Sequence, residues 1–450
     1  MGFELSNLPA TWEVRRLDEC VDAGLVTYGI VQPGGEDPSG IPVIRVNNFN
    51  DGSIVLRDLL KVSKEVESKY HRTRLKGGEV LLTLVGSVGQ VAIAHKSLRG
   101  CNVARAVGVM RPKPDIGSRW LSLCLRSPES QRMLGLAANT TVQTTINLKD
   151  VKALPIPLPP MDERRSIEEI ICALDDKIAL LRETNATLEA IAQALFKSWF
   201  VDFDPVRAKA EGRDPEGVTP EVADLFPSEF ENSELGAIPK GWRVFTLGDH
   251  LDVVRGLSYK GSGLTNENDP EGVPMHNLNS VMEGGGYKYA GIKFYKGEYK
   301  SKHEIKAGDI IVANTEQGHR YLLIGFPAVI PVRVEKVGIF SHHLYRVRPA
   351  PSSPFGPLFI LRLLMVPAVR EQVIGCSNGT TVNMLKADGL AMPRFACPPR
   401  PLIEAYENIA APIQARQEQN IVTAENLASI RDTLLPRLMT GKLRVDEVAV

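Results

Sequence analysis

The chain of 450 residues lacks the features that mark several large classes of protein. Its longest apolar runs are only a handful of residues, whereas a membrane-spanning helix needs roughly 20, and its first residues do not resemble a signal peptide. Its six cysteines are scattered without a Cys-x-x-Cys pair, so neither a zinc knuckle nor a disulfide framework is predicted. The composition, 43% apolar and 24% charged, is typical of globular proteins. We therefore expect a soluble, cytoplasmic protein of about three domains, at roughly 150 residues each.

Motifs of nucleotide-dependent enzymes are absent too. An adenine methyltransferase grips its flipped base with an Asn- or Asp-Pro-Pro-aromatic loop. The two Pro-Pro pairs here occur instead as Leu158-Pro159-Pro160-Met161 and Cys397-Pro398-Pro399-Arg400. A phosphate-binding loop needs Gly-x-x-x-x-Gly-Lys-Ser/Thr, but Gly441-Lys442 has Pro436 in place of the first glycine and Leu443 in place of the hydroxyl residue. The sequence therefore predicts that the chain is not an enzyme.

Nuclease and metal sites have equally little support. Carboxylates of the nuclease kind occur only as Pro114-Asp115 and Glu298-Tyr299-Lys300, which lie in different halves of the chain. His319 and the His342-His343 pair have no acidic or thiol partner at metal-ligand spacing. We therefore expect no catalytic residue, no metal site and no cofactor of the chain's own, and an autonomous nuclease is a distant alternative.

The formal net charge is zero, but the charges are unevenly distributed along the chain. Residues 1–160 carry a net charge of +5, residues 161–235 carry −10, residues 236–400 carry +7 and residues 401–450 carry −2. A surface that neutralises phosphates must concentrate cations locally, whatever the total charge. Two basic blocks on either side of an acidic one favour two nucleic-acid-binding modules on a spacer, although imbalances of this size also arise by chance.

The sequence repeats itself with a period of 230–239 residues. Leu8-Pro9-Ala10-Thr11-Trp12 returns as Ile238-Pro239-Lys240-Gly241-Trp242, and the segment 75–82 returns at 305–312. Thr144-Thr145-Ile146-Asn147 corresponds to Thr380-Thr381-Val382-Asn383, and the Pro-Pro pairs follow in the same order. So long a period indicates a duplicated domain with its connector, because solenoid repeats have periods of about 20–50 residues.

Each half begins with strands and ends with a helix. Short β-branched and apolar runs at 41–46, 80–85, 91–94 and 107–110 are bounded by Gly, Pro and Asn, which is typical of strands and turns. The proline-rich segment 155–160 ends strand pairing, and a helical pattern follows. We predict five segments: a first strand-rich domain at 1–160, a central helix at 161–200, a connector at 201–237, a second strand-rich domain at 238–399 and a C-terminal helix at 400–445.

Both predicted helices carry a heptad pattern, with spacings that alternate between three and four residues. On the first helix, the seam consists of Ile167, Ile171, Leu174, Ile178, Leu181, Asn185, Leu188 and Leu195. On the second, it includes Ile413, Asn420, Leu427 and Leu434, with Ile409, Ile430 and Leu438 continuing the spacing. Asn185 is the residue type that fixes register in such seams. The alternative, an amphipathic helix on a globular core, needs a wider apolar stripe.

These patterns together predict an α+β fold with an internal duplication. A full domain lies between the two helices in the sequence, so we expect an antiparallel coiled-coil pair that separates two strand-rich domains. From Ile167 to Trp199 the first helix would span roughly 48 Å at about 1.5 Å per residue. That is more than one turn of B-DNA, about 34–36 Å, so the pair could act as a ruler between two DNA half-sites.

Three motifs resemble the specificity subunits of type I restriction-modification enzymes. Leu158-Pro159-Pro160-Met161-Asp162-Glu163-Arg164 is similar to the segment before the family's first conserved helix, with Arg164 where Gln is usual. The segments 195–205 and 233–242 are similar to its central conserved segment and to the start of its second target-recognition domain. The resemblance implies two domains that each read one half of a bipartite site on double-stranded DNA.

The resemblance also implies partners. These would be two adenine methyltransferase subunits, with restriction/translocase subunits when the complex cleaves DNA, and no membrane. The partner subunits would use S-adenosylmethionine, ATP and magnesium. The alternative from another class is a coiled-coil scaffold that carries two β-domains for ligands other than DNA, and it predicts no salt-dependent affinity for DNA.

Residues that read DNA need side chains that form directed hydrogen bonds with base edges. In the first half the candidates are Asn47, Asn48, Ser87, Gln90, Arg105, Thr141 and Gln143. In the second half they are Asn277, Asn314, Thr315, Gln317, Arg320, His342, Asn378 and Thr380. We favour the loops 87–90 and 314–320, which follow equivalent predicted strands. An Asn or Thr in either set could instead stabilise a turn through its own backbone.

Overall fold

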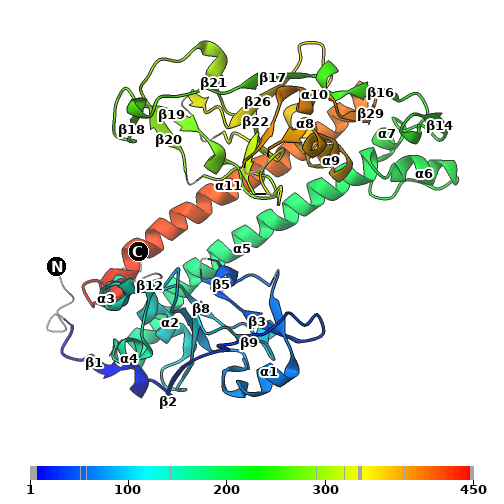
Figure 1. Ribbon diagram of the computed structural model, residues 1–450. Coiled ribbons are helices and arrows are strands. Elements are labelled where there is room, and N and C mark those ends of the chain that lie inside the picture. Colours follow the sequence, from blue (N-terminus) through cyan, green and yellow to red (C-terminus); the bar gives the residue numbers. More distant parts are fainter. Residues whose placement is uncertain are drawn as a thin grey trace. The chain divides into compact units, whose positions relative to one another are not determined.

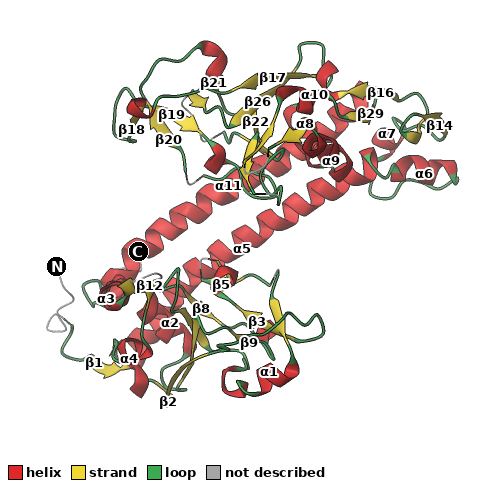
Figure 2. Cartoon of the chain, in the orientation of Figure 1, coloured by secondary structure: helices red, strands yellow, loops and turns green. Residues whose placement is uncertain are grey.

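The structure is a computed structural model that describes residues 8–50, 52–56, 58–140, 144–289, 291–318, 320–332, 337–379 and 382–445. It divides into two compact units, which are described separately below. Unit 1 comprises Met1–Leu180 and Thr423–Val450, and unit 2 comprises Leu181–Val422. Figure 2 shows that each unit combines strands with long helices, as the predicted α+β class requires. Within the described part of the chain, no helix has a stretch long and apolar enough to cross a bilayer.

Unit 1 contains a strand-rich domain built on a four-stranded antiparallel sheet (Figure 1). Its strand order is β2 (Val21–Tyr28), β10 (Val107–Pro112), β7 (Val80–Thr83) and β8 (Val91–Ile93). A second sheet has the order β6 (Leu60–Val62), β3 (Ile41–Ile44) and β9 (Asn102–Val103). Two hairpin-like pairs are β4 (Phe49–Asn50) with β5 (Ser53–Ile54) and β11 (Asn139–Thr140) with β12 (Thr144–Thr145). The short helices are α1 (Lys64–Ser68), α2 (Ser118–Arg126), α3 (Pro128–Ala137) and α4 (Leu148–Lys152).

The ends of this domain are joined by β1 (Glu13–Arg16) and β13 (Pro155–Leu158), which pair antiparallel. The central strand β7 is buried along its whole length, since one face of the sheet packs against α2. Trp120 of α2 is fully buried, and its indole Nε1 donates to the carbonyl of Pro157 at 2.9 Å. This bond ties the helix to the strand that leads into the long helix that follows.

Unit 2 contains a domain with the same plan. Its main sheet has the order β17 (Leu251–Arg255), β26 (Leu344–Pro349), β22 (Ile310–Ala313) and β24 (Pro327–Val329). Its second sheet has the order β18 (Leu264–Thr265), β20 (Lys293–Tyr295), β19 (Val273–His276), β25 (Gly338–Phe340) and β21 (Glu304–Ile305). A three-stranded sheet consists of β23 (Thr315–Gln317), β28 (Val382–Leu385) and β27 (Ser377–Asn378). The short helices are α8 (Pro357–Met365), α9 (Pro367–Gly375) and α10 (Ala387–Ala391).

The predicted duplication is confirmed by the topology. The order β2-β10-β7-β8 in unit 1 matches β17-β26-β22-β24 in unit 2, strand for strand along the sequence. The pair β1–β13 has its counterpart in β16 (Arg243–Thr246) with β29 (Arg394–Cys397). The parallel pairs β3–β9 and β19–β25 also correspond. Each domain therefore begins and ends at the same pair of strands and delivers the chain into a long helix.

The connector in unit 2 holds α6 (Asp204–Ala210), α7 (Pro220–Ala223) and the hairpin β14 (Phe230–Ser233) with β15 (Gly236–Pro239). It packs on an aromatic cluster at the end of the first long helix. Trp199 contacts Phe226 edge to face at 5.4 Å between ring centroids, and Phe200 contacts Phe359 at 5.1 Å. Tyr406 completes the cluster. The segment Leu195–Asp204 is thus rich in aromatics because it forms this core.

The two long helices are α5 (Met161–Phe200) and α11 (Arg400–Met439). In unit 1, Ile167 and Ile171 of α5 share a hydrophobic core with Leu435 and Leu438 of α11. In unit 2, the Tyr406 hydroxyl donates to the carbonyl of Ala192 at 3.3 Å. Residue numbers rise along α5 as those of its partners fall along α11, so the predicted antiparallel pairing is confirmed. The seam of α5 is buried or half-buried at each of the eight predicted positions.

Five of the seven positions predicted for the seam of α11 are buried or half-buried, Leu438 among them. Ile413, Asn420, Leu427 and Leu434 are buried or half-buried, but Ile409 is 38% exposed and Ile430 is 48% exposed. The inward positions between the correct ones are Ala410, Gln417, Ala424 and Arg431. A search for large apolar residues does not detect these four positions, because two of them are alanines and two are polar. The alanines allow the helices to approach closely, and the polar residues form specific contacts. The helix also continues past Pro436 to Met439.

Candidate nucleic-acid interface

In unit 1 the favoured loop and the predicted polar run lie side by side. The loop between β7 and β8 contacts the β11–β12 hairpin, where the amide of Gly86 donates to the carbonyl of Thr144 at 2.9 Å. Val85 and Thr145 form an isolated β-bridge, and the amide of Ile146 donates to the carbonyl of Leu84 at 2.9 Å. Two segments about 60 residues apart in sequence therefore form one polar edge of the domain.

Internal hydrogen bonds fix the conformation of this loop. The Thr83 hydroxyl donates to the Ser87 carbonyl at 2.6 Å and accepts from the amide of Gln90 at 2.9 Å. Gln131 of α3 donates to the carbonyl of Gly89 at 2.9 Å. Gly89 has a φ of 88°, and a Cβ there would meet the Gln131 amide, so glycine is required. The loop presents Ser87 to solvent and leaves Gln90 half-buried.

Unit 2 brings the corresponding segments together in the sheet of β23, β28 and β27. Gln317 pairs with Val382, and Asn378 pairs with Met384. Gln317 and Asn378 are exposed, as a base-reading role requires. Val382 is 51% exposed and Met384 is 41% exposed on the same sheet, and the sequence analysis had missed both. No sequence signal marked them, because the Val-Asn-Met-Leu strand buries its polar Asn383 and exposes its apolar neighbours.

Side chains of Glu316 and Arg370 fix the backbone of the segment after β23. The Glu316 carboxylate, 5% exposed, accepts from the backbone amides of Leu322, Leu323 and Ile324 at 2.8, 2.8 and 3.0 Å. Arg370 of α9 donates to the carbonyl of Tyr321, and its guanidinium lies 3.8 Å from the centre of the Phe326 ring. These contacts fix the backbone that carries the exposed Arg320.

Four predicted residues have structural roles instead. Asn48 is 3% exposed and accepts from the amide of Arg45 at 2.9 Å. Asn277 is 6% exposed, accepts from the amide of Asn279 at 3.0 Å and donates to the carbonyl of Gly291 at 2.7 Å. Asparagine in such turns stabilises the backbone. Both side chains are therefore enclosed by the bonds they form with their own domain.

Asn314 and Thr315 are likewise buried, at 1% and 3% exposure. Asn314 Nδ2 donates to the carbonyl of His342 at 3.0 Å, and the Thr315 hydroxyl lies 2.9 Å from His343 Nδ1. Burial and nearby cations, His342 first, lower the pKa of His343. His342 itself is half-buried. The buried pair thus supports the segment that places the histidines and does not itself face solvent.

The remaining candidates fall into two groups. Asn47 and Arg105 are exposed in unit 1. Thr141, Gln143 and Thr380 lie outside the described residues. Among the described residues, three or more His, Cys, Asp or Glu side chains do not gather in a way that could hold a metal ion. Each unit therefore presents a rigid polar edge whose chemistry suits hydrogen bonding to a ligand.

Comparisons with known proteins agree with this architecture. The family profile of the type I restriction modification DNA specificity domain matches residues 9–190. The chain is 32% identical over 198 residues to the EcoBI specificity subunit of Escherichia coli, in an alignment that covers 42% of each chain. It is 24% identical over 460 residues to the MjaIX specificity subunit of Methanocaldococcus jannaschii, covering 99% of this chain and 96% of the relative.

A solved structure shows the same fold. The crystal structure of the type I restriction-modification system S subunit from M. genitalium matches with a TM-score of 0.54 at 13% identity. The match covers 97% of this chain and 98% of that one. The chain therefore matches the family's profile over residues 9–190, and over nearly its whole length it is similar in sequence or in fold to specificity subunits of type I restriction-modification enzymes.

Proposed function

We propose that this chain reads a bipartite site on double-stranded DNA, with one half-site bound by the polar edge of each domain. The observation that carries the proposal is the repetition of that edge. In each unit a loop or strand after the equivalent central strand, β7 or β22, lies against the segment that follows α3 or α9. Two copies of one surface suit two similar ligands, and the halves of a split DNA sequence are such ligands.

Direct readout is assigned to the predicted residues of each domain that are exposed or half-buried. In unit 1 they are Asn47, Ser87, Gln90 and Arg105, and in unit 2 they are Gln317, Arg320, His342 and Asn378. Amide side chains match adenine, and guanidinium groups match guanine. The exposed Val382 and Met384 suit contact with a thymine methyl group. The exposed cations Arg72, Lys76, Lys300 and Lys302 would bind phosphates and position the duplex without specifying its sequence.

The chemistry belongs to partner subunits in this proposal. The chain would present target adenines to two adenine methyltransferase subunits that use S-adenosylmethionine. Restriction/translocase subunits that use ATP and magnesium would join the complex when it cleaves DNA. The complex would act in the cytoplasm, where it meets invading phage DNA. The pair α5–α11 would set the length of the spacer between the half-sites.

Salt-dependent DNA binding tests this proposal against a scaffold for ligands other than DNA. The assay measures the affinity of the purified complex for its methylated sequence at several salt concentrations. The logarithm of the affinity should fall linearly with the logarithm of salt, with a slope of about −0.9 for each phosphate neutralised. An affinity that depends on neither the salt concentration nor the DNA sequence would contradict the proposal. It would favour a coiled-coil scaffold for ligands other than DNA.

A further inference from the structure

In each β-domain one short helix bonds the long helices at both of its ends, α2 in unit 1 and α8 in unit 2. The N-terminal end of α2 is held by Glu168 of α5, whose carboxylate accepts from the backbone amide of Trp120. The N-terminal end of α8 is held in the same way by Glu407 of α11, which accepts from the amide of Phe359 at 2.6 Å. The duplication therefore extends to the residues that attach the domains.

The other end of each short helix carries an arginine that reaches a carboxylate on α5. In unit 1, Arg126 forms two bonds with Asp175, at 2.6 and 3.1 Å, and Arg431 of α11 adds a third at 2.9 Å. In unit 2, Arg362 forms two bonds with Glu189, one of them at 2.8 Å. We call these contacts the unit 1 clamp (Arg126, Asp175, Arg431) and the unit 2 clamp (Arg362, Glu189).

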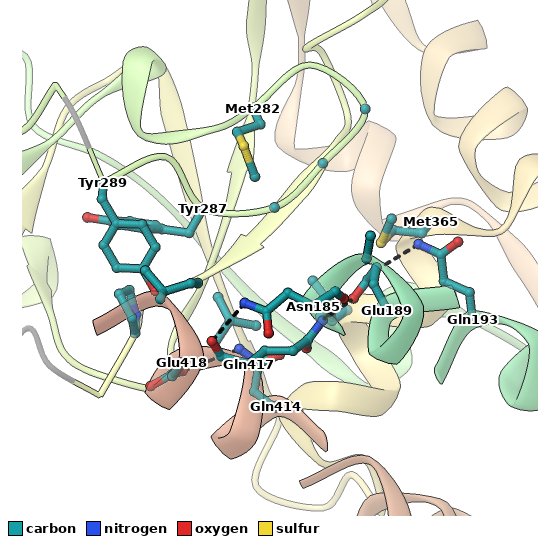
Figure 3. A pocket seen from close by; sticks show the side chains of 18 residues that line it. Asn185, Glu189, Gln193, Met282, Tyr287, Tyr289, Met365, Gln414, Gln417 and Glu418 are labelled. Carbon is teal, nitrogen blue, oxygen red and sulfur yellow. Dashed lines mark hydrogen bonds between the residues drawn. The ribbon is translucent and has the colours of Figure 1, made fainter. Parts of the chain in front are cut away.

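The unit 2 clamp is joined to the contact between the long helices. Gln417 of α11 lies 3.3 Å from the Glu189 carboxylate and donates to the carbonyl of Asn185 at 3.1 Å. Asn185 in turn donates to the carbonyl of Gln417 at 3.0 Å and accepts from Asn420 at 2.8 Å. Figure 3 shows the part of this network formed by Asn185, Gln417, Glu189 and Gln193. One network therefore fixes the helix register and the second domain together.

A cavity of about 420 Å³ lies beside the same network. Met282, the Gly284–Gly286 turn and Tyr287 line it from the domain, while Asn185 and Gln417 line it from the helices (Figure 3). Apolar packing does not fill this space, so it does not by itself prevent the domain from tilting toward the helices. The clamp at the margin of the cavity, where Arg362 is 5% exposed, resists that tilt.

We propose that the two clamps are positioning elements that determine how strictly the spacer length is read. This inference rests on the proposed function. One base pair added to a spacer moves a half-site by about 3.4 Å and rotates it by about 35°. A domain that its clamp holds in one orientation on the helices cannot reach the displaced half-site. A domain that is free to tilt can compensate for part of the displacement.

The test maps adenine methylation in cells that carry the complete complex. The variant Arg362→Met with Glu189→Gln removes the unit 2 clamp without leaving a buried charge unpaired, which limits the cost in stability. Relative to the cognate site, methylation of sites with a spacer one base pair longer or shorter should rise by roughly tenfold, a size within the range for one lost coupling. Both half-site sequences should stay unchanged. Arg126→Met with Asp175→Asn should do the same through unit 1.

Two further variants separate positioning from general stability. Arg400→Met with Glu404→Gln removes an exposed ion pair within α11 and should leave the spacer profile unchanged. The exchange Arg362→Glu with Glu189→Arg should restore strict spacing. An unchanged spacer profile in the clamp variants, or the same relaxation in the control, would overturn the inference and leave the proposed function intact. A wild-type complex without a split motif would overturn both.

Discussion

At the scale of single residues, polar side chains of the β-domains have two distinct roles. Asn277 and Gln317 are both amides near strand ends in the second half of the sequence. Asn277 is buried and bonded to the backbone, whereas Gln317 is exposed on β23. The sequence alone could not separate the two roles, because burial depends on neighbours far away in the chain. This is why the predicted binding residues divide into an exposed and a buried group.

Replacing Gln317 should weaken DNA binding, whereas replacing Asn277 should lower the stability of the fold. Gln317→Ala should weaken binding to one half-site by about 1–3 kcal/mol, the value of one good base contact. Asn277→Ala should lower the free energy of unfolding by about 1–3 kcal/mol, because it leaves buried backbone groups without partners. Titration with cognate DNA and denaturant unfolding measure the two effects. The exposed Asn268 provides a control, and a Gln317→Ala variant that binds like Asn268→Ala would contradict the assignment.

The clamp carboxylates should make stability depend on acid pH. Burial alone would raise the pKa of Asp175, but the hydrogen bonds and charges of Arg126 and Arg431 outweigh it and lower that pKa. Burial is likewise outweighed at Glu189, chiefly by Arg362, and its pKa is lowered. A carboxyl whose pKa is lowered by folding stabilises the folded state above its unfolded pKa, and this contribution is lost as pH falls through the folded pKa.

The free energy of unfolding should therefore decrease as pH falls below about 5. The decrease should be shallower in a variant that combines Asp175→Asn with Arg126→Met, because that carboxyl no longer titrates. Denaturant unfolding at a series of pH values measures the slopes. Equal slopes in the variant and the wild type would show that Asp175 does not contribute.

At the scale of elements, the two long helices differ in how well a heptad pattern identifies their inward-facing residues. The seam of α5 was predictable because large apolar residues occupy almost every inward position. The seam of α11 was predicted only in part, because Ala410, Gln417, Ala424 and Arg431 occupy alternate inward positions. The strand order of the two β-domains could not be predicted either, since pairing between distant strands leaves no local signal. Asn185, by contrast, was expected to fix the register, and it bonds Asn420 and Gln417.

Substitutions at this asparagine pair should show its role. Asn420→Leu alone leaves the Asn185 side-chain oxygen without the partner it has in the structure and should cost about 1–3 kcal/mol of stability. The double variant with Asn185→Leu should recover that loss, since two apolar residues replace both partners. Thermal unfolding of the purified complex measures both. A single variant as stable as the wild type would contradict the proposed register contact.

At the scale of the whole molecule, the duplicated plan is the feature from which function follows. Each copy of the β-domain is followed along the chain by one copy of the long helix. Each copy of the polar edge therefore belongs to a separate half of the sequence. The duplication was visible in the sequence because Trp, Pro-Pro and Gly-acid landmarks return in the same order. The identity of the bases read by each edge could not be predicted, because it depends on loop geometry and on DNA shape.

A matched insertion tests whether the helices measure the spacer. Seven residues that continue the heptad pattern, inserted in both α5 and α11, lengthen each helix by about 10 Å. The preferred spacer should lengthen by about three base pairs, at 3.4 Å each. Methylation of a library of sites with different spacers measures the preference. A spacer preference that stays the same in a folded insertion variant would contradict the ruler role.

The most direct test of the central claim is a genome-wide map of adenine methylation. Cells that express this chain together with the proposed methyltransferase partner are compared with cells that lack only this chain, by modification-sensitive sequencing. We expect a split motif that disappears when the chain is deleted, and that loses specificity in one half when Gln317 and Asn378 are replaced by alanine. A methylation pattern that is the same with and without the chain would contradict the account.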